Sequence, residues 1–147
     1  MKTIIVLGTA RDDSNTLKAV QELCPFKEFE LFDLRQMSIA PYNYQKEYPA
    51  TDNYLKIAHA MSEADNIIFA TPVYWYSMSA SLKNFFDRLS DLISTQKSIG
   101  RSLKGKKTYL ISTGWEVTLP TGFEEPFKLT SEYFEMNYQG AIYKSVR

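Results

Sequence analysis

The residues best suited to chemistry lie in a polar and aromatic run, TPVYWYS, at positions 71–77. The run follows an apolar segment, residues 66–70, and leads into a strongly amphipathic one. In open α/β sheets, the loop that joins a parallel strand to the next helix holds the ligand. This loop offers large rings and closely spaced backbone donors and acceptors. Such groups suit a flat heteroaromatic molecule that is stacked on its face and hydrogen-bonded along its edge.

A second polar loop, residues 8–16, joins the first apolar segment to the first helical one. We expect Gly8 to allow a tight turn, and a helix start to add free N–H groups and positive potential. The side chains that can donate to phosphate oxygens are Thr9, Ser14, Asn15 and Thr16. The loop has neither the Gly-Lys-Ser/Thr ending of a triphosphate site nor the three glycines of a dinucleotide fingerprint. Of the phosphate ligands considered, only the single phosphate of a mononucleotide still fits this loop.

Two observations compete with this phosphate hypothesis. Asp12 and Asp13 carry charges that oppose a phosphate dianion unless they point to solvent and Arg11 offsets them. In addition, Ser14 or Asp13 could be a simple helix cap. From this loop alone, a phosphate cradle and a cap are equally good interpretations.

A third loop contains Thr113, Gly114 and Trp115, after the apolar segment 107–112. A glycine allows backbone to approach a ring closely, and a tryptophan can form the wall of a pocket. Ordinary loop packing of Trp115 is an equally good interpretation.

Together these motifs resemble the flavodoxin-like NAD(P)H-dependent FMN reductase family. Its signature is a Thr-Pro-x-Tyr turn followed by a Leu-Lys-Asn-x-x-Asp helix, which correspond here to Thr71, Pro72 and Tyr74, then Leu82, Lys83, Asn84 and Asp87. The loop at 8–16 is similar to the family's Gly-Ser-x-Arg-x-x-Ser-x-Thr pattern, with Thr9 in place of serine. Ser79 stands where the family usually has proline, and serine can cap the helix as well.

The resemblance implies an FMN site built from all three loops. Phosphate would be held by Thr9, Arg11, Ser14, Asn15 and Thr16, the ring edge by Pro72, Val73, Tyr74 and Trp75, and the far wall by Thr113, Gly114 and Trp115. It also implies NAD(P)H as co-substrate and a ping-pong transfer of electrons to a quinone, azo compound, flavin or similar acceptor. No side chain is needed as a catalytic acid or base.

The alternative function is that of a non-enzymatic electron carrier or FMN-binding interaction module. Carriers of the flavodoxin type tend to be strongly acidic, whereas this chain has 17 Lys plus Arg and 17 Asp plus Glu. The neutral balance favours the enzyme. It also gives no reason to expect nucleic acid or an acidic membrane surface as partner.

Other polar residues are expected to be structural. His59 has no ligand at metal-binding spacing, so we predict a surface histidine and no metal site. Cys24, on an apolar helix face, is predicted to be inert core. Lys83, Asp87 and Arg88 are predicted to form ion pairs on the surface of a helix.

Strands and helices alternate along the whole chain. Residues 3–7, 66–70 and 107–112 are apolar runs typical of strands buried on both faces, residues 29–32 suggest a strand nearer an edge, and residues 139–144 a weaker last strand. Helical spacing follows Ser14 and Asp52, and recurs over 78–93 and 124–136. The order predicts a doubly wound α/β fold, flavodoxin-like, with a five-stranded parallel sheet in the order 2-1-3-4-5. Residues 35–50 are predicted to be an ordered loop.

The 147 residues are predicted to be one domain, 1–147. The chain has one cysteine, no N-terminal targeting pattern and no apolar stretch near the roughly 18 residues needed to cross a bilayer, so we predict a soluble, cytoplasmic protein.

No helix is predicted after the last strand, where a flavodoxin-like domain normally has one. One face of the sheet is then covered by the first helix alone, so the third, fourth and fifth strands should leave a large apolar patch on that face. We therefore expect a homodimer, or cover from the aromatic loops at 42–48 and 115–127.

Overall fold

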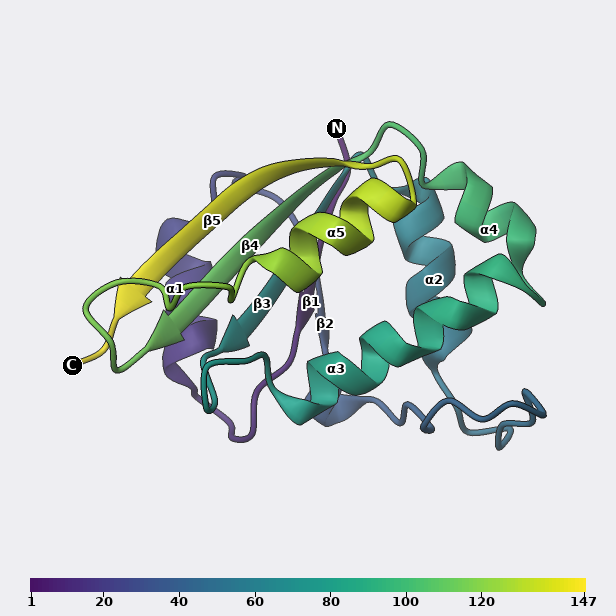
Figure 1. Ribbon diagram of the computed structural model, residues 1–147, viewed down its shortest axis with the longest axis horizontal. Coiled ribbons are helices and arrows are strands. Elements are labelled where there is room, and N and C mark those ends of the chain that lie inside the picture. The colour runs from purple at the N-terminus through teal and green to yellow at the C-terminus, as the bar shows by residue number, and fades with distance from the viewer.

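The computed structural model describes residues 1–147 as a five-stranded sheet flanked by helices (Figure 1). The strands are β1 (Thr3–Leu7), β2 (Glu30–Asp33), β3 (Asn66–Pro72), β4 (Lys107–Gly114) and β5 (Asn137–Ser145). All neighbouring pairs are parallel and the order is β2-β1-β3-β4-β5. The predicted doubly wound, flavodoxin-like sheet is therefore confirmed.

The helices are α1 (Asn15–Leu23), α2 (Tyr54–Glu63), α3 (Ala80–Asp87), α4 (Lys97–Ser102) and α5 (Glu125–Tyr133), with two 3-10 helices, η1 (Leu34–Gln36) and η2 (Arg88–Ile93). The predicted helix at 78–93 is thus α3 continued by η2. The short helix α4 was not predicted. Its pattern is interrupted by Gly100, where a Cβ atom would lie 2.1 Å from the carbonyl oxygen of Leu92, so α4 packs against η2 at a distance that only glycine permits.

The sheet separates two apolar layers because side chains alternate along each strand. Ile4, Ile67 and Leu110 belong to the larger core, which α2, α3 and α5 cover. Ile5, Ile68 and Ile111 belong to the smaller core on the other face, beneath α1. In Figure 1, α1 lies behind the sheet and α5 lies in front of it. No helix has both the length and the apolar character required to span a membrane.

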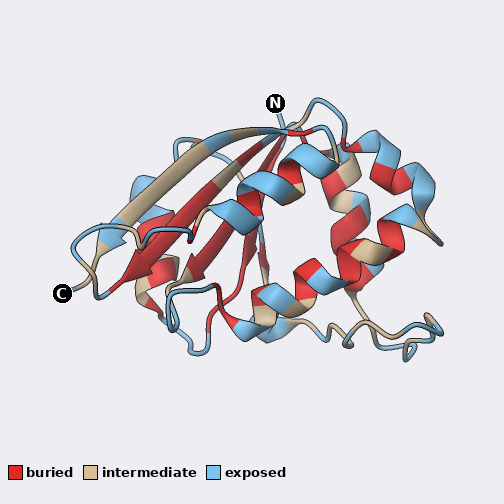
Figure 2. Ribbon diagram, in the orientation of Figure 1, coloured by how far each residue is buried: buried red, intermediate tan, exposed pale blue.

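The large apolar patch predicted over the third, fourth and fifth strands is wrong. Ile68, Ala70 and Ile111 are completely buried, because α1 packs across β3 and β4 rather than over β1 alone. Phe26, in the connection from α1 to β2, adds cover by packing edge-on against Tyr109 of β4 at 5.4 Å. Only β5 stays half-buried, as its colour in Figure 2 shows.

Neither aromatic loop covers that face. Phe123 and Phe127 enter the larger core on the opposite side of the sheet. The loop between η1 and α2 lies ordered against α3 and η2, where Asn84 donates to Ile39 O at 2.9 Å and Tyr48 donates to Asp91 Oδ1 at 3.1 Å.

The predicted ion pair between Lys83 and Asp87 is present on the surface of α3, but the prediction for Arg88 is wrong. Arg88 is 1% exposed and pairs with Asp52 and Asp91, which are themselves buried side chains. Asp52 stands in the loop before α2, far from Arg88 along the chain, so no local spacing in the sequence revealed the buried pair of Arg88 with Asp52.

Candidate functional site

The first polar loop lies at the carboxyl end of β1 and ends at α1. Ser14 is the N-cap of α1, and its Oγ accepts a hydrogen bond from Leu17 N at 3.1 Å. The Ser14 hydroxyl proton remains free to be donated to a ligand. Asn15 and Thr16 occupy the first two helical positions, whose backbone N–H groups have no partner within the helix. Ser14 can therefore cap the helix and donate a hydrogen bond to a phosphate at the same time.

The acidic residues of this loop are neutralised, but not by Arg11. Asp12 pairs with Arg35 at 3.1 Å, and Asp13 pairs with Lys18 at 3.8 Å. Arg11 has no ion-pair partner in the chain and lines the cavity described below. Its charge is thus available to an anionic ligand.

Gly8 is required for space and not for a turn. Its φ is not in the left-handed region, but a Cβ atom would lie 2.7 Å from Ser79 Oγ and 2.8 Å from Leu82 Cβ. Gly8 therefore lets the end of β1 pack closely against the start of α3, which corrects the prediction of a tight turn.

The second loop is fixed at both ends. Thr71 Oγ1 accepts from Ser79 N at 2.9 Å, and the predicted cap is present, since Ser79 Oγ accepts from Leu82 N at 3.2 Å. Val73 N donates to Thr113 O at 2.8 Å, which extends the pairing of β3 with β4. Between these anchors, Tyr74 and Ser77 close a two-residue turn with hydrogen bonds of 2.9 and 3.1 Å.

The turn itself is strained. Trp75 and Tyr76 have φ values of 48° and 66°, so both central residues are left-handed, as in a type I′ turn. Such turns prefer Asn-Gly, and a left-handed residue other than glycine costs about 1–2 kcal/mol. The two side chains are 93% and 64% exposed.

The third loop is joined to the first by a buried hydrogen bond between the hydroxyls of Thr16 and Thr113, 2.7 Å apart. Gly114 gives room to its neighbours, because a Cβ atom there would lie 2.8 Å from the hydroxyl of Tyr143 and 3.1 Å from Val73 Cβ. Trp115 follows, 66% exposed. The three loops thus form one connected edge of the sheet.

These loops enclose a cavity of about 230 Å³. It lies at the carboxyl ends of β1, β3 and β4, where the strand order reverses between β1 and β3, which is the point at which open α/β sheets bind ligands. The lining residues are Arg11, Ser14, Asn15, Thr16, Pro72, Val73, Tyr74, Thr113, Gly114, Trp115 and Val146.

The structure brings together all of the predicted site residues except Thr9 and Trp75. Thr9 is buried and its hydroxyl donates to Arg11 O at 3.0 Å, so it shapes the loop from beneath. Trp75 projects into solvent. Val146 was missed; it reaches the cavity because its N–H donates to Gly114 O at 2.8 Å, a contact that no pattern in the sequence signals.

The donors of this cavity fit a phosphorylated, flat ring. Hydroxyl and amide side chains, a free guanidinium and a helix start gather at the α1 end, whereas Pro72, Tyr74 and Trp115 supply apolar surface at the other. The backbone N–H groups of Val73 and Tyr74 are already used within the protein.

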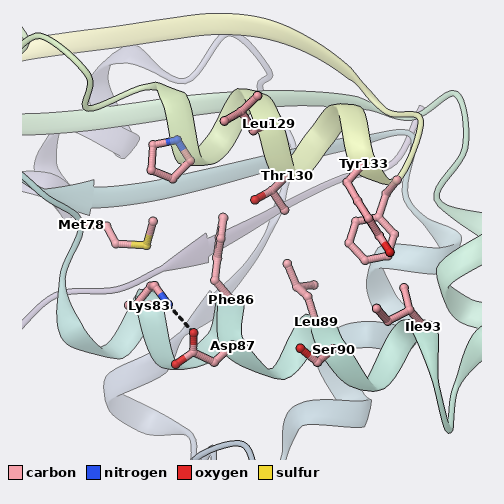
Figure 3. Close-up of a pocket in the computed structure, with 12 residues that line it drawn as sticks. Met78, Lys83, Phe86, Asp87, Leu89, Ser90, Ile93, Leu129, Thr130 and Tyr133 are labelled. Atoms are coloured by element: carbon pink, nitrogen blue, oxygen red, sulfur yellow. Dashed lines mark hydrogen bonds and ion pairs between the residues drawn. The ribbon is translucent and has the colours of Figure 1, made fainter.

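A larger cavity, about 400 Å³, lies between α3, η2 and α5 (Figure 3). Its base is formed by Met78, Phe86 and Leu89, which are nearly buried, and Leu129 and Tyr133 stand exposed on its rim. Lys83 and Asp87, which lie on its edge, are paired with each other. This apolar groove shares no lining residue with the cavity at the strand ends, and it has few free polar groups with which to orient a small ligand.

The remaining candidates lie outside both cavities. His59 is exposed on α2, and no cluster of three or more His, Cys, Asp and Glu side chains is arranged to hold a metal ion. Cys24 is half-buried at the end of α1, and burial raises the pKa of its thiol. A raised pKa keeps the thiol protonated and unreactive.

Comparison with known proteins points to one family. Residues 1–118 match the family described as NADPH-dependent FMN reductase. A Bacillus subtilis protein with the provisional name NAD(P)H-dependent FMN-containing oxidoreductase YwqN is 24% identical over 97% of this chain and 83% of its own length. The FMN-dependent NADPH-azoreductase of Staphylococcus aureus is 30% identical over 68% of this chain, which spans only 58% of that relative.

Solved structures agree on the fold. The Trp repressor binding protein of Bacillus subtilis has a TM-score of 0.79 at 21% identity, with 99% of this chain and 85% of that one covered. General stress protein 14 of Treponema denticola, solved in complex with FMN, has a TM-score of 0.69 at 20% identity, with 99% and 86% covered.

Proposed function

The chain belongs to the family of NADPH-dependent FMN reductases, and from this membership we propose that it is an oxidoreductase that binds FMN in the cavity between its three loops. The observation that carries the proposal is that one cavity combines two kinds of surface. The unpaired Arg11 and the start of α1 lie at one end, and an apolar, aromatic wall lies at the other, where the strand order reverses between β1 and β3. Bound FMN would supply two-electron chemistry, accepting a hydride from NAD(P)H and, after the nicotinamide leaves, passing two electrons to an acceptor that also takes up a proton from water.

The residues of the chain act in this proposal by binding and orientation. Arg11, Ser14, Asn15 and Thr16 hold the phosphate, Tyr74 and Trp115 flank the ring, and the buried bond between Thr16 and Thr113 keeps the two ends of the cavity in register. Arg11 and Tyr74 are the only titratable side chains of the lining. Hydride transfer to a flavin needs no acid or base from the protein, so we assign no catalytic acid or base.

The acceptor we propose is a small aromatic molecule such as a quinone or an azo compound. Relatives carry the names NADPH azoreductase, in Bacillus sp., and FMN-dependent NADH:quinone oxidoreductase, in Burkholderia thailandensis. The chain spans 51% and 38% of these two relatives. The alternative, a flavodoxin-type electron carrier, is disfavoured by the formal net charge of zero.

We also propose a homodimer and a cytoplasmic location. The single cysteine suits a reducing compartment. A second copy would cover the apolar groove between α3 and α5, whose rim carries one lysine and one aspartate and is therefore complementary to itself in charge.

The decisive experiment is titration of the apo-protein with FMN, followed by anaerobic addition of NADPH. Quenching of flavin fluorescence and bleaching of the visible flavin band are the expected results. In Arg11→Ala, loss of a charge-assisted bond should weaken FMN about ten-fold or more, while Arg101→Ala, which removes an exposed arginine on α4, should bind as the wild type does. Absence of FMN binding by the wild type would reduce the proposal to a shared fold.

A further inference from the structure

Two aromatic rings stand outside the candidate FMN cavity and have no role within the chain. Tyr74 lines the cavity, and the next two residues, Trp75 and Tyr76, carry their rings out into solvent. Neither ring pairs with another aromatic ring, and neither polar tip makes a hydrogen bond to the protein. Trp115, also exposed, lines the same cavity from the β4 loop.

The backbone beneath these rings is held in an unfavourable shape. Both residues are left-handed at φ 48° and 66°, a conformation that bulky side chains rarely adopt. The paired hydrogen bonds between Tyr74 and Ser77, and the bond from Val73 N to Thr113 O, keep the turn in place. An exposed tryptophan on a strained turn stabilises nothing in the fold, and strain of this kind is concentrated at functional sites.

We propose that Trp75 and Tyr76 form a stacking platform for flat aromatic electron acceptors at the mouth of the flavin cavity, and so determine which acceptors the enzyme uses. This inference rests on the proposed function and extends it to acceptor choice. The strained turn presents the rings outward, where an incoming ring can be stacked before it reaches the cavity. Acceptors without a flat ring gain nothing from the platform.

The test compares Trp75→Gly and Tyr76→Gly with the wild-type holoprotein. Anthraquinone-2-sulfonate is the aromatic probe, titrated by calorimetry into the oxidised protein and used as acceptor in steady-state assays with NADPH, and ferricyanide is the non-stacking acceptor. Each variant should bind the anthraquinone about two- to ten-fold more weakly, with a matching loss of kcat/KM. The FMN dissociation constant and kcat/KM for ferricyanide should stay as in the wild type.

A second measurement checks the strain. Glycine accepts the left-handed conformation, so both variants should melt about 2–4 °C higher than the wild type. Glu135→Gly is the matched control, since Glu135 is also left-handed at φ 59° but lies beyond α5, away from the cavity. It should show the same gain in Tm with no change in anthraquinone binding.

Three results would overturn the platform. Equal anthraquinone affinity in the wild type and both variants removes the rings from acceptor binding. A parallel loss of FMN affinity makes them cofactor contacts, and loss of self-association in light scattering makes them a subunit contact. Failure of the wild type to bind FMN or oxidise NADPH is a separate outcome, because it removes the proposed function before the variants are compared.

Discussion

Arg88 is surrounded by aromatic faces as well as by carboxylates. The centre of its guanidinium lies 3.5 Å from the centroid of the Tyr48 ring and 4.6 Å from that of Tyr54. Cation–π contacts of this kind are worth up to about 2 kcal/mol when they are desolvated. The two tyrosines differ at their hydroxyls, since Tyr48 donates to Asp91 whereas the completely buried Tyr54 hydroxyl has no hydrogen-bond partner.

We predict that Tyr54→Phe stabilises the protein. The substitution keeps the ring against Arg88 and removes a buried, unsatisfied hydroxyl, so the free energy of unfolding should rise by about 1 kcal/mol or more. Urea denaturation at pH 7 measures it. Tyr48→Phe is the matched control and should be destabilising, because it breaks the bond to Asp91.

The difference between the Tyr54→Phe variant and the wild type should grow in alkali. Burial raises the pKa of Tyr54 far above its ordinary value of 10, so its phenol ionises in the unfolded chain first. Above the pKa of the unfolded chain, only the unfolded state releases the phenol proton, so rising pH favours unfolding. Unfolding above pH 10 should therefore become easier for the wild type than for the variant, and a constant difference across pH would contradict the burial of this hydroxyl.

At the scale of elements, one guanidinium holds the loop between η1 and α2 against the helices. Arg88 donates to both carboxylate oxygens of Asp52 at 2.9 Å, to Asp91 Oδ2 at 3.0 Å and to Ala40 O at 2.9 Å. Burial by itself would raise the pKa of Asp52, but the bonds from Arg88 and Ala40 outweigh it and lower that pKa below 3.8. The contribution of the pair is therefore present above about pH 4 and lost as pH falls further.

We predict that Arg88→Met costs about 3–5 kcal/mol at pH 7, because it leaves two buried carboxylates without a cation. Amide hydrogen exchange should become faster across residues 38–53. The pH dependence should reverse: without its cation the buried Asp52 carboxylate has a raised pKa, because burial is no longer offset by Arg88, so the variant should gain stability as pH falls from 7 towards 4. Lys104→Ala, which removes an exposed pair with Glu135, should change stability by less than about 1 kcal/mol.

The elements that sequence predicts best are those buried on both faces. The strands β1, β3 and β4 give continuous apolar runs because helices cover both their sides, and their first residues were predicted correctly. The edge strand β5 begins two residues before its predicted start of 139, near Gly140, which is left-handed, and where the pairing with β4 shifts register. An edge strand with an irregular register has no clean alternation to recognise.

The candidate site shows the same division. Its polar residues were predictable because strand ends and helix starts fix where Ser14, Asn15 and Thr16 must lie. The direction of the Trp75 ring could not be predicted, because it depends on two left-handed φ values at residues that rarely adopt them. The buried position of Arg88 depends on Asp52, which is 36 residues away along the chain.

At the scale of the whole molecule, we place the interface of the proposed dimer on the face of the sheet that α2, α3 and α5 cover. Ile68, Ala70 and Ile111 are completely buried within one chain, so no apolar patch on the α1 face requires a second subunit to cover it. The groove between α3 and α5 has exposed apolar residues on its rim, with Leu129 at 56% and Tyr133 at 66%. A two-fold axis across α3 would set Lys83 of each copy opposite Asp87 of the other, so the same patch can serve on both subunits.

We predict a dimer at micromolar concentration by light scattering, and its loss in Leu129→Glu. Leu129 is more than half exposed, so a glutamate there costs the monomer little stability but places a charge in an apolar interface. Ile142→Glu, on half-buried β5, is the comparison: it should leave the dimer intact, although it lowers the thermal midpoint. A wild-type mass of one chain would contradict self-association altogether. A dimer that survives Leu129→Glu but not Ile142→Glu would return the interface to the α1 face, because only that surface includes the β5 residue.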